Sequence, residues 1–289
     1  MKIALLFCII LSTTLSYADI CGRITSLRGA VEVLRLKNEK DKSTDRLGII
    51  AQNKMSLWCS DIIVSRKAAR AKIRLKNHAT LTLGPHSRIE ILNHINNTTD
   101  VNQLKLTYGK VRALFHDNKA KKPKKLPEKK DKNSNNFSRL IIKTPSVVAG
   151  VRGTDFYISY SPIRKKTEQA TIEGQVLVEN EVTQEKIIVD PGKQVAVDLI
   201  APEVATEIKA ELKKGKNLQQ IQREKGLDEL AVEPIKEVVK EEIRQTSAIA
   251  RNDKDFTSQQ AVEILGAPEK WQLPPDEIPL DLKDIKEEF

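Results

Sequence analysis

Four histidines and a scattering of serines are the candidate catalytic or metal-binding groups of this sequence. A metal site or an acid–base pair needs such side chains at a spacing that unites them, for example H-x-H or H-E-x-x-H. The histidines instead lie on separate turn-like stretches, at His78, His86, His94 and His116. No serine lies in a G-x-S-x-G setting, which would mark a nucleophile. We therefore expect no catalytic residue, no metal and no cofactor.

Arg152 offers a different chemistry, because its guanidinium lies in an otherwise apolar run from Val147 to Phe156. A guanidinium in such a strand must find acceptors or reach water. The candidate acceptors are Asp155, Glu173 and turn carbonyls that would tie two sheets together, and pairing with any of them would give Arg152 a structural role. The alternative is an exposed Arg152 that recognises a carboxylate or phosphate on a partner.

The surrounding segment, residues 143–156, predicts a strand, a turn and a second strand. Thr144 is extended because it precedes Pro145, and Pro145 has no amide to donate to a ladder. Gly150 and Gly153 permit a close backbone approach or a positive φ. Gly150-Val151-Arg152-Gly153 is too short to form a phosphate-binding loop.

This run, with V-R-G-T-D-F at its end, resembles the signature of the FecR domain family. The resemblance covers roughly Ile24 to Asp198 and includes a Gly-x-Val turn at Gly174. It implies a structural or partner-binding role for the signature residues, which are Thr144, Pro145, Gly150, Val151, Arg152, Gly153, Thr154, Phe156 and Gly174.

The family is named for iron-transport regulators with a similar periplasmic half, which control a sigma factor through a membrane helix and a short cytoplasmic domain. We find neither of those two parts in this sequence. Other exported relatives carry the domain as an envelope-binding module.

Period-two alternation of apolar residues predicts many short strands across residues 19–200. Gly29, Gly109 and Gly174 each stand two residues before a valine at the start of such a run. This faint repeat favours a β-sandwich or a short β-solenoid in which each glycine makes a tight turn or bulge.

Residues 1–18 have the charged start, apolar middle and Ser16-Tyr17-Ala18 end of a secretory signal peptide, cut after Ala18. We therefore expect an exported protein of the periplasm or cell envelope, and no later stretch is long enough to span a membrane. A lipoprotein signal ending at Cys21 is the weaker alternative. Cys21 and Cys59 remain as an even pair, either as a disulfide or as two free thiols.

Charge divides the mature chain into a basic body and an acidic tail. Residues 19–200 carry 34 Lys and Arg against 19 Asp and Glu, whereas residues 201–289 carry 14 against 20. A lysine-rich insertion at 116–138 predicts a disordered loop, which is either a solvated spacer or a grip for an anionic polymer. Its polyanion-binding candidates are Lys121, Lys122, Lys124, Lys125, Lys129 and Lys130.

Residues 201–289 predict several thin amphipathic helices, with a disordered end. Helices with such narrow apolar faces need a surface to pack on. That surface is the basic body, a partner or a second copy of the chain.

The whole sequence thus predicts a non-catalytic, exported protein that binds a protein or an anionic cell-wall polymer as a scaffold or signalling module, with no nucleic acid as partner. The main alternative is a periplasmic sensor component of an iron-uptake type of system, acting from a transporter to a sigma factor through a separate membrane partner.

Overall fold

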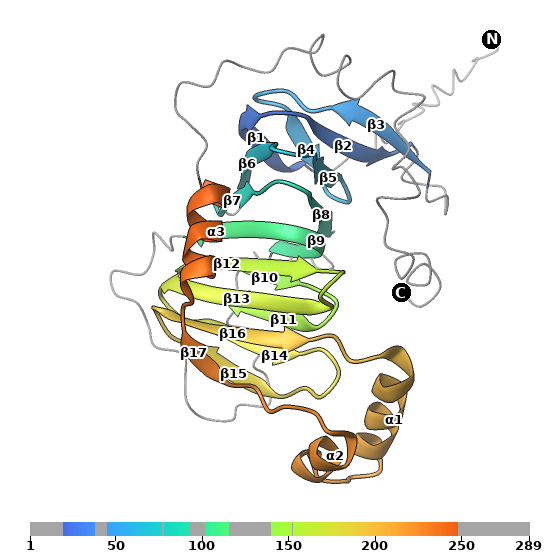
Figure 1. Ribbon diagram of the computed structural model, residues 1–289. Coiled ribbons are helices and arrows are strands. Elements are labelled where there is room, and N and C mark those ends of the chain that lie inside the picture. The colour runs from blue at the N-terminus through green and yellow to red at the C-terminus, as the bar shows by residue number, and fades with distance from the viewer. Residues whose placement is uncertain are drawn as a thin grey trace, which may run out of the picture.

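The computed structural model describes residues 20–37, 45–76, 78–92, 102–115, 140–151 and 153–247. Most of these residues form strands, and three helices follow near the C-terminal end (Figure 1). The segment predicted as a signal peptide, the lysine-rich insertion, Arg152 and everything after Ser247 lie outside the described residues. No helix within the described ranges is both long enough and apolar enough to cross a bilayer.

The strands form two layers, which we call sheet A and sheet B. In spatial order, sheet A contains β4 (Ser56–Trp58), β1 (Ile20–Arg28), β6 (Arg70–Leu75), β7 (Thr80–Leu83), the second half of β9 (Asn102–Phe115), β12 (Thr154–Ser161), β13 (Lys166–Glu173), β16 (Lys193–Asp198) and β17 (Val232–Pro234). Sheet B contains β3 (Arg46–Ile50), β2 (Val31–Leu36), β5 (Ile62–Ser65), β8 (Ser87–Leu92), the first half of β9, β10 (Leu140–Lys143), β11 (Val147–Val151), β14 (Val176–Asn180) and β15 (Lys186–Val189).

Strand β9 belongs to both sheets. Its residues up to Tyr108 pair with β8 and β10 in sheet B, and its residues from Gly109 onward pair with β7 and β12 in sheet A. Gly109, at the change of sheet, has φ +93°. A Cβ at this position would overlap the backbone of His86 and Ser87, so only glycine fits the crossing without displacement.

The two other glycines of the sequence repeat occupy equivalent places. Gly29, with φ +71°, joins β1 in sheet A to β2 in sheet B, and Gly174, with φ +80°, joins β13 in sheet A to β14 in sheet B. The repeat in the sequence therefore marks the points where the chain passes from one layer to the other. The expected fold, mainly β with a sandwich or short-solenoid arrangement and a helical C-terminal part, is confirmed.

The core fills the space between the sheets. Alternate residues of each strand face inward, as in β6, where Ala71, Ile73 and Leu75 are buried and the intervening residues are exposed. Phe156 from β12 is fully buried in the same cluster. This single apolar cluster joins strands from both ends of the body.

The disulfide between Cys21 and Cys59 ties β1 to the turn that follows β4. The pair expected from the even cysteine count is thus present. It lies at one end of the sandwich, where β4 is the outermost strand of sheet A.

Two helices follow β16 and a third follows β17, and the first two have clear end signals. Helix α1 (Pro202–Lys213) begins with proline, and α2 (Leu218–Lys225) is capped by the Asn217 side chain and ends at Gly226 with φ +64°. Helix α3 (Glu237–Ser247) lies across sheet A, as Figure 1 shows. We expected only helices here, but between α2 and α3 the chain adds β17 to sheet A. Val232 and Glu233 of this strand pair with β16.

Replacing Gly109 with alanine should destabilise the protein strongly, because the new Cβ meets backbone atoms and φ is positive. We expect G109A to lower the free energy of unfolding by at least about 2 kcal/mol in denaturant titrations. Gly192 also has a positive φ, but nothing lies within 4 Å of its Cβ position. G192A should therefore cost only about 1 kcal/mol, and equal losses for the two variants would contradict this view of the crossing.

Reduction of the disulfide should lower the free energy of unfolding by about 4 kcal/mol, since the bond closes a long loop in the unfolded chain. The measurement compares urea titrations of oxidised and reduced protein, with the Cys21→Ser and Cys59→Ser double variant as a control for effects of the reductant. If the reduced protein unfolded at the same urea concentration as the oxidised one, the proposed contribution would be wrong.

Candidate functional site

The first part of the signature, Thr144 to Val147, forms the turn between β10 and β11. The Thr144 and Ser146 hydroxyls lie 2.9 and 2.6 Å from the Thr167 hydroxyl of β13, and the Val147 amide donates to Thr144 Oγ1 at 3.1 Å. Thr144, Ser146, Val147 and Thr167 are all buried. This hydroxyl cluster joins a turn of sheet B to a strand of sheet A, while Pro145 sits in the turn, where no ladder amide is needed.

The second part of the signature also lies between the sheets. Gly153, with φ +70°, places its carbonyl oxygen 2.7 Å from the position that a Cβ on Gly174 would take, so the two glycine turns pack against each other. Thr154 donates its hydroxyl to the Gln175 carbonyl at 3.2 Å. Val151 and Phe156 are core residues and Gly150 lies within β11. The described signature residues are thus placed as packing and turn positions.

Asp155, one of the two carboxylates considered for Arg152, binds a different arginine. Arg112 of β9 makes two hydrogen bonds to the Asp155 carboxylate, at 2.9 and 2.6 Å. This pairing raises the pKa of the Arg112 guanidinium, chiefly through the hydrogen bonds. Arg112 also donates to the Ser247 hydroxyl at 2.7 Å. Asp155 therefore connects to the end of α3, a link that the sequence analysis missed.

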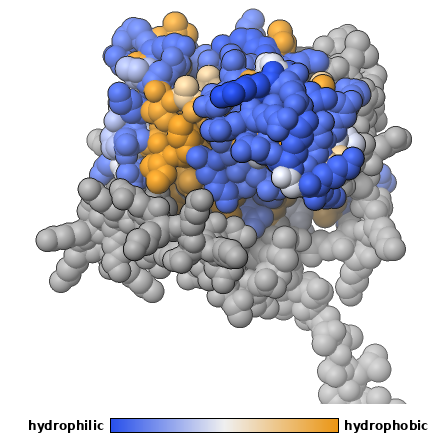
Figure 2. Space-filling view, turned by 90° about the horizontal axis from the view of Figure 1, so that it is seen from below, coloured by the Kyte–Doolittle hydropathy of each residue, from blue (hydrophilic) through white to orange (hydrophobic). Residues whose placement is uncertain are grey.

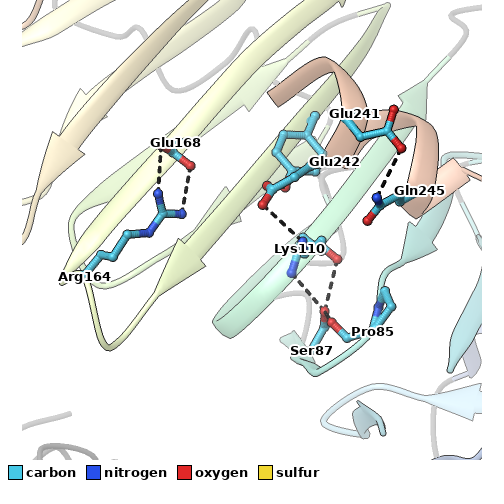
Figure 3. Close-up of polar contacts among 9 residues, drawn as sticks. Pro85, Ser87, Lys110, Arg164, Glu168, Glu241, Glu242 and Gln245 are labelled. Atoms are coloured by element: carbon cyan, nitrogen blue, oxygen red, sulfur yellow. Dashed lines mark hydrogen bonds and ion pairs between the residues drawn. The ribbon is translucent and has the colours of Figure 1, made fainter. Parts of the chain in front are cut away.

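Helix α3 is held on sheet A by a set of contacts that we call the α3 clasp. Tyr157 of β12 donates its hydroxyl to one oxygen of Glu242 at 2.5 Å, and the Lys110 ammonium lies 3.3 Å from the other oxygen. Arg70 of β6 donates to the Gln245 carbonyl at 2.6 Å. Figure 3 shows Glu242 pointing from the helix to Lys110. The Glu242 carboxylate, from the acidic tail, thus contacts a lysine and a tyrosine of the body.

The clasp also has an apolar part. Val239 of α3 is buried against Tyr157 and Ala170, and Ile235 and Ile243 pack at its sides. Burial and the Glu242 carboxylate raise the pKa of the Tyr157 phenol far above its ordinary value, so this hydroxyl remains a donor at physiological pH.

Two ion pairs in the other half of the body are also largely buried. Arg35 makes hydrogen bonds to both oxygens of Asp61 at 3.0 and 2.7 Å and lies 3.9 Å over the Trp58 ring. Glu32 accepts from Arg66 at 3.1 Å, and burial raises the pKa of its carboxyl despite that arginine. Each pair links neighbouring strands or turns, so both serve the fold.

A cleft of about 680 Å³ opens where the helices meet the end of the body. We call it the C-terminal cleft. Apolar side chains from β16, α1 and the segment after α2 line it, together with a rim of charges. Its main lining residues are Lys166, Val197, Asp198, Leu199, Ile200, Val204, Lys225, Leu227, Asp228, Glu229, Leu230 and Glu233.

Hydrogen bonds fix residues on both sides of the cleft. One Glu185 carboxylate oxygen accepts from the Leu230 amide at 3.0 Å, and the other accepts from the Gln222 side chain at 2.8 Å. On the β16 side, Gln194 donates to Glu233 of β17 at 2.8 Å. The walls are therefore fixed by hydrogen bonds to the hairpin after β14 and to the last strand.

The remaining candidate residues are dispersed. His78 and His86 lie at separate turns, while His94 and His116 fall outside the described residues, as do the six lysines of the insertion. Within the described ranges, no group of three or more His, Cys, Asp or Glu side chains is placed to hold a metal ion.

Comparison with known families finds a match within the body. The FecR protein family matches residues 61–177, from the start of β5 into β14. Residues 61–177 therefore match a FecR domain. The matched range includes the bent strand β9, the signature and Gly174, whereas the helices, β17 and most of the C-terminal cleft follow the FecR domain.

Two crystal structures of a candidate anti-sigma factor from Parabacteroides distasonis show a low similarity. The first shares 13% identity and a TM-score of 0.36 over 47% of this chain, which spans 54% of that structure. The second shares 12% identity and a TM-score of 0.37 over 68% of this chain and 99% of that structure. Similarity at this level carries no argument about function. No curated protein matches the sequence.

Loss of the Glu242 charge should loosen the α3 clasp. We expect Glu242→Gln to weaken docking of the helix by about 1–3 kcal/mol, because the Tyr157 and Lys110 donors lose a charged acceptor. Hydrogen exchange of the α3 amides measures this weakening directly.

The neighbouring Glu241 is the matched control. Its side chain contacts Arg244 and Gln245, which both lie within the helix. Glu241→Gln should therefore change exchange by less than about 0.5 kcal/mol. Equal effects of the two substitutions would mean that Glu242 acts through helix stability and not through docking.

Proposed function

We propose that this protein is an exported, non-catalytic FecR-type signalling component that binds a protein of the cell envelope in its C-terminal cleft. The observation that carries the proposal is the FecR domain at residues 61–177, with a cleft built onto its end by the chain that follows. The scaffolding role predicted from the sequence requires the same binding event.

The chemistry of the cleft favours a peptide segment with both apolar and basic side chains. Val197, Leu199, Ile200 and Leu227 provide apolar lining, which contributes affinity through burial. Lys166 and Asp198 pair with each other at 3.2 Å, so their charges are balanced.

Two carboxylates on the rim are available to a partner. Asp228 and Glu229 are exposed, and within the described residues neither forms an ion pair. Lysine or arginine on the bound segment would supply the missing positive charge. This arrangement fits a protein ligand better than an anionic polymer, which the rim would repel.

Export is supported by the chemistry of the cysteines. A disulfide between Cys21 and Cys59 persists in an oxidising compartment such as the periplasm. The apolar segment near the N-terminus, with its small-residue end, would act as the signal peptide that directs export. Both features fit a protein that works in the envelope.

The more specific alternative, a sensor component that acts from a transporter to a sigma factor, depends on the FecR domain alone. In that role the protein would act through a separate membrane partner. Polymer anchoring through Lys121, Lys122, Lys124, Lys125, Lys129 and Lys130 is a different class of function. Polymer binding would weaken steeply with added salt, whereas a largely apolar protein contact would not.

Site-specific photocrosslinking in the full-length chain tests the proposal. A crosslinker at Asp228 or Glu229 should capture one protein partner in living cells, whereas a crosslinker at the exposed Lys72 of β6 should not capture that partner. Mass spectrometry identifies the product. Capture of the same protein from both positions, or of polysaccharide alone from Asp228, would contradict binding in the cleft.

The full chain is needed for this test because β17 and α3 of the tail pack on the body. A chain that ended at Leu199 would lack β17 and the α3 clasp, and would uncover Tyr157 and Ala170. Loss of binding by such a truncation would not separate a missing contact from damaged packing.

A further inference from the structure

Sheet B ends at β15, whose outer edge has no paired strand among the described residues. The Asn180 amide donates to the Glu185 carbonyl at 2.9 Å, which defines a hydrogen-bonded pair at the start of the β14–β15 ladder. Backbone groups alternate in direction along an antiparallel strand. Ile187 and Val189 therefore direct their amides and carbonyls toward β14, while Lys186 and Ile188 direct theirs outward.

Side chains near this edge are largely apolar. Ile187 is partly buried against the core, and Leu230 packs beside that core from the segment before β17. Val232 of β17 is among the exposed large apolar residues. Figure 2, which views this end of the molecule from below, shows a hydrophobic strip bordered by hydrophilic surface. An open edge beside an apolar strip is a site for pairing with another strand.

The sequence of the edge complements itself. If two β15 strands pair in an antiparallel manner about Ile188, each Lys186 lies opposite Asp190 of the second copy, and Ile187 lies opposite Val189. Opposite charges facing each other across a ladder stabilise the pair, and the two-fold axis repeats the contact. Lys186 and Ile188 on the edge of β15, and Asp190 directly after the strand, then each have a suitable neighbour.

We propose that the β15 edge is a homodimerisation surface, on which a second copy of this chain continues sheet B through antiparallel pairing centred on Ile188. The dimer would have two-fold symmetry and would close, because each copy uses the same strand.

The other strand ends fit this role less well. The two outer strands of sheet A, β4 and β17, have only three residues each, and β17 ends in Pro234, which lacks an amide to donate. β3 is the outer strand of sheet B at the opposite end. Self-pairing of β3 about Gly48 would place Arg46 opposite Ile50, with no balancing charge. Charge complementarity therefore selects β15.

Neither partner of the proposed ion pair is committed to the core. Lys186 lies 3.2 Å from Glu179 on the adjacent strand, with 43% of its side chain exposed. Asp190 accepts from the exposed Gln175 side chain at 2.7 Å. Reversing either charge should thus leave the fold intact, which the thermal melting temperature of each variant checks.

Charge reversal followed by charge exchange tests the dimer. Sedimentation equilibrium of the full-length chain should show a concentration-dependent dimer. Lys186→Asp and Asp190→Lys should each weaken it at least tenfold, since each creates two repulsive pairs. The double variant K186D/D190K restores opposite charges and should recover most of the affinity. Lys72→Asp, on the exposed face of β6, is the matched control and should leave the dimer unchanged.

Three results would overturn the proposal. The wild-type chain could remain monomeric at millimolar concentration, including the case in which the edge takes a strand from a different protein. A dimer could form but resist both single reversals. The folded double variant could stay as weak as the single variants, which would mean that Lys186 and Asp190 do not face each other.

Discussion

The bend of strand β9 at Gly109 is the constraint on which the rest of the structure depends. One continuous strand provides the central ladder of both sheets, so the two layers cannot separate or slide without breaking its pairing with β7, β8, β10 and β12. The crossing needs a positive φ and has no room for a Cβ. The signature turns at Gly153 and Gly174 support the same arrangement farther along, because they pack against each other between the sheets.

The position of the helices follows from this frame. The second half of β9 carries Lys110 and Arg112 on the outer face of sheet A, and β12 adds Tyr157 beside them. Glu242 and Ser247 of α3 bind these residues, so the described part of the acidic tail, up to Ser247, is attached to the basic body. Before it reaches α3, the chain forms α1, α2 and β17 at the end of the sandwich, and residues of these three elements line the C-terminal cleft. The proposed binding site, which lies mostly outside residues 61–177, thus adjoins a helix that is held by contacts to those residues.

Much of the fold could be predicted from the sequence, because its signals are local. Alternating apolar residues indicate strands, Pro202 and Gly226 mark helix ends, and the three Gly-x-Val repeats mark the sheet crossings. The clasp could not be predicted in this way. Arg112 and Tyr157 are ordinary outward-facing residues of their strands, and their partners lie 135 and 85 residues away. Asp155 was one of two carboxylates considered as acceptors for Arg152, which lies outside the described residues, and its bond to Arg112 on the adjacent strand was not foreseen. Strand β17 was missed because three residues ending in proline are too few to show a period.

The central claim is that the tail and the FecR domain together build a cleft that binds an envelope protein. Hydrogen–deuterium exchange of the full-length protein, with and without a solubilised envelope fraction, tests it most directly. The account predicts added protection in residues 196–201 and 226–231, with exchange in β9 unchanged. Protection that appears only on the outer face of sheet A, or in no part of the cleft, would contradict the account.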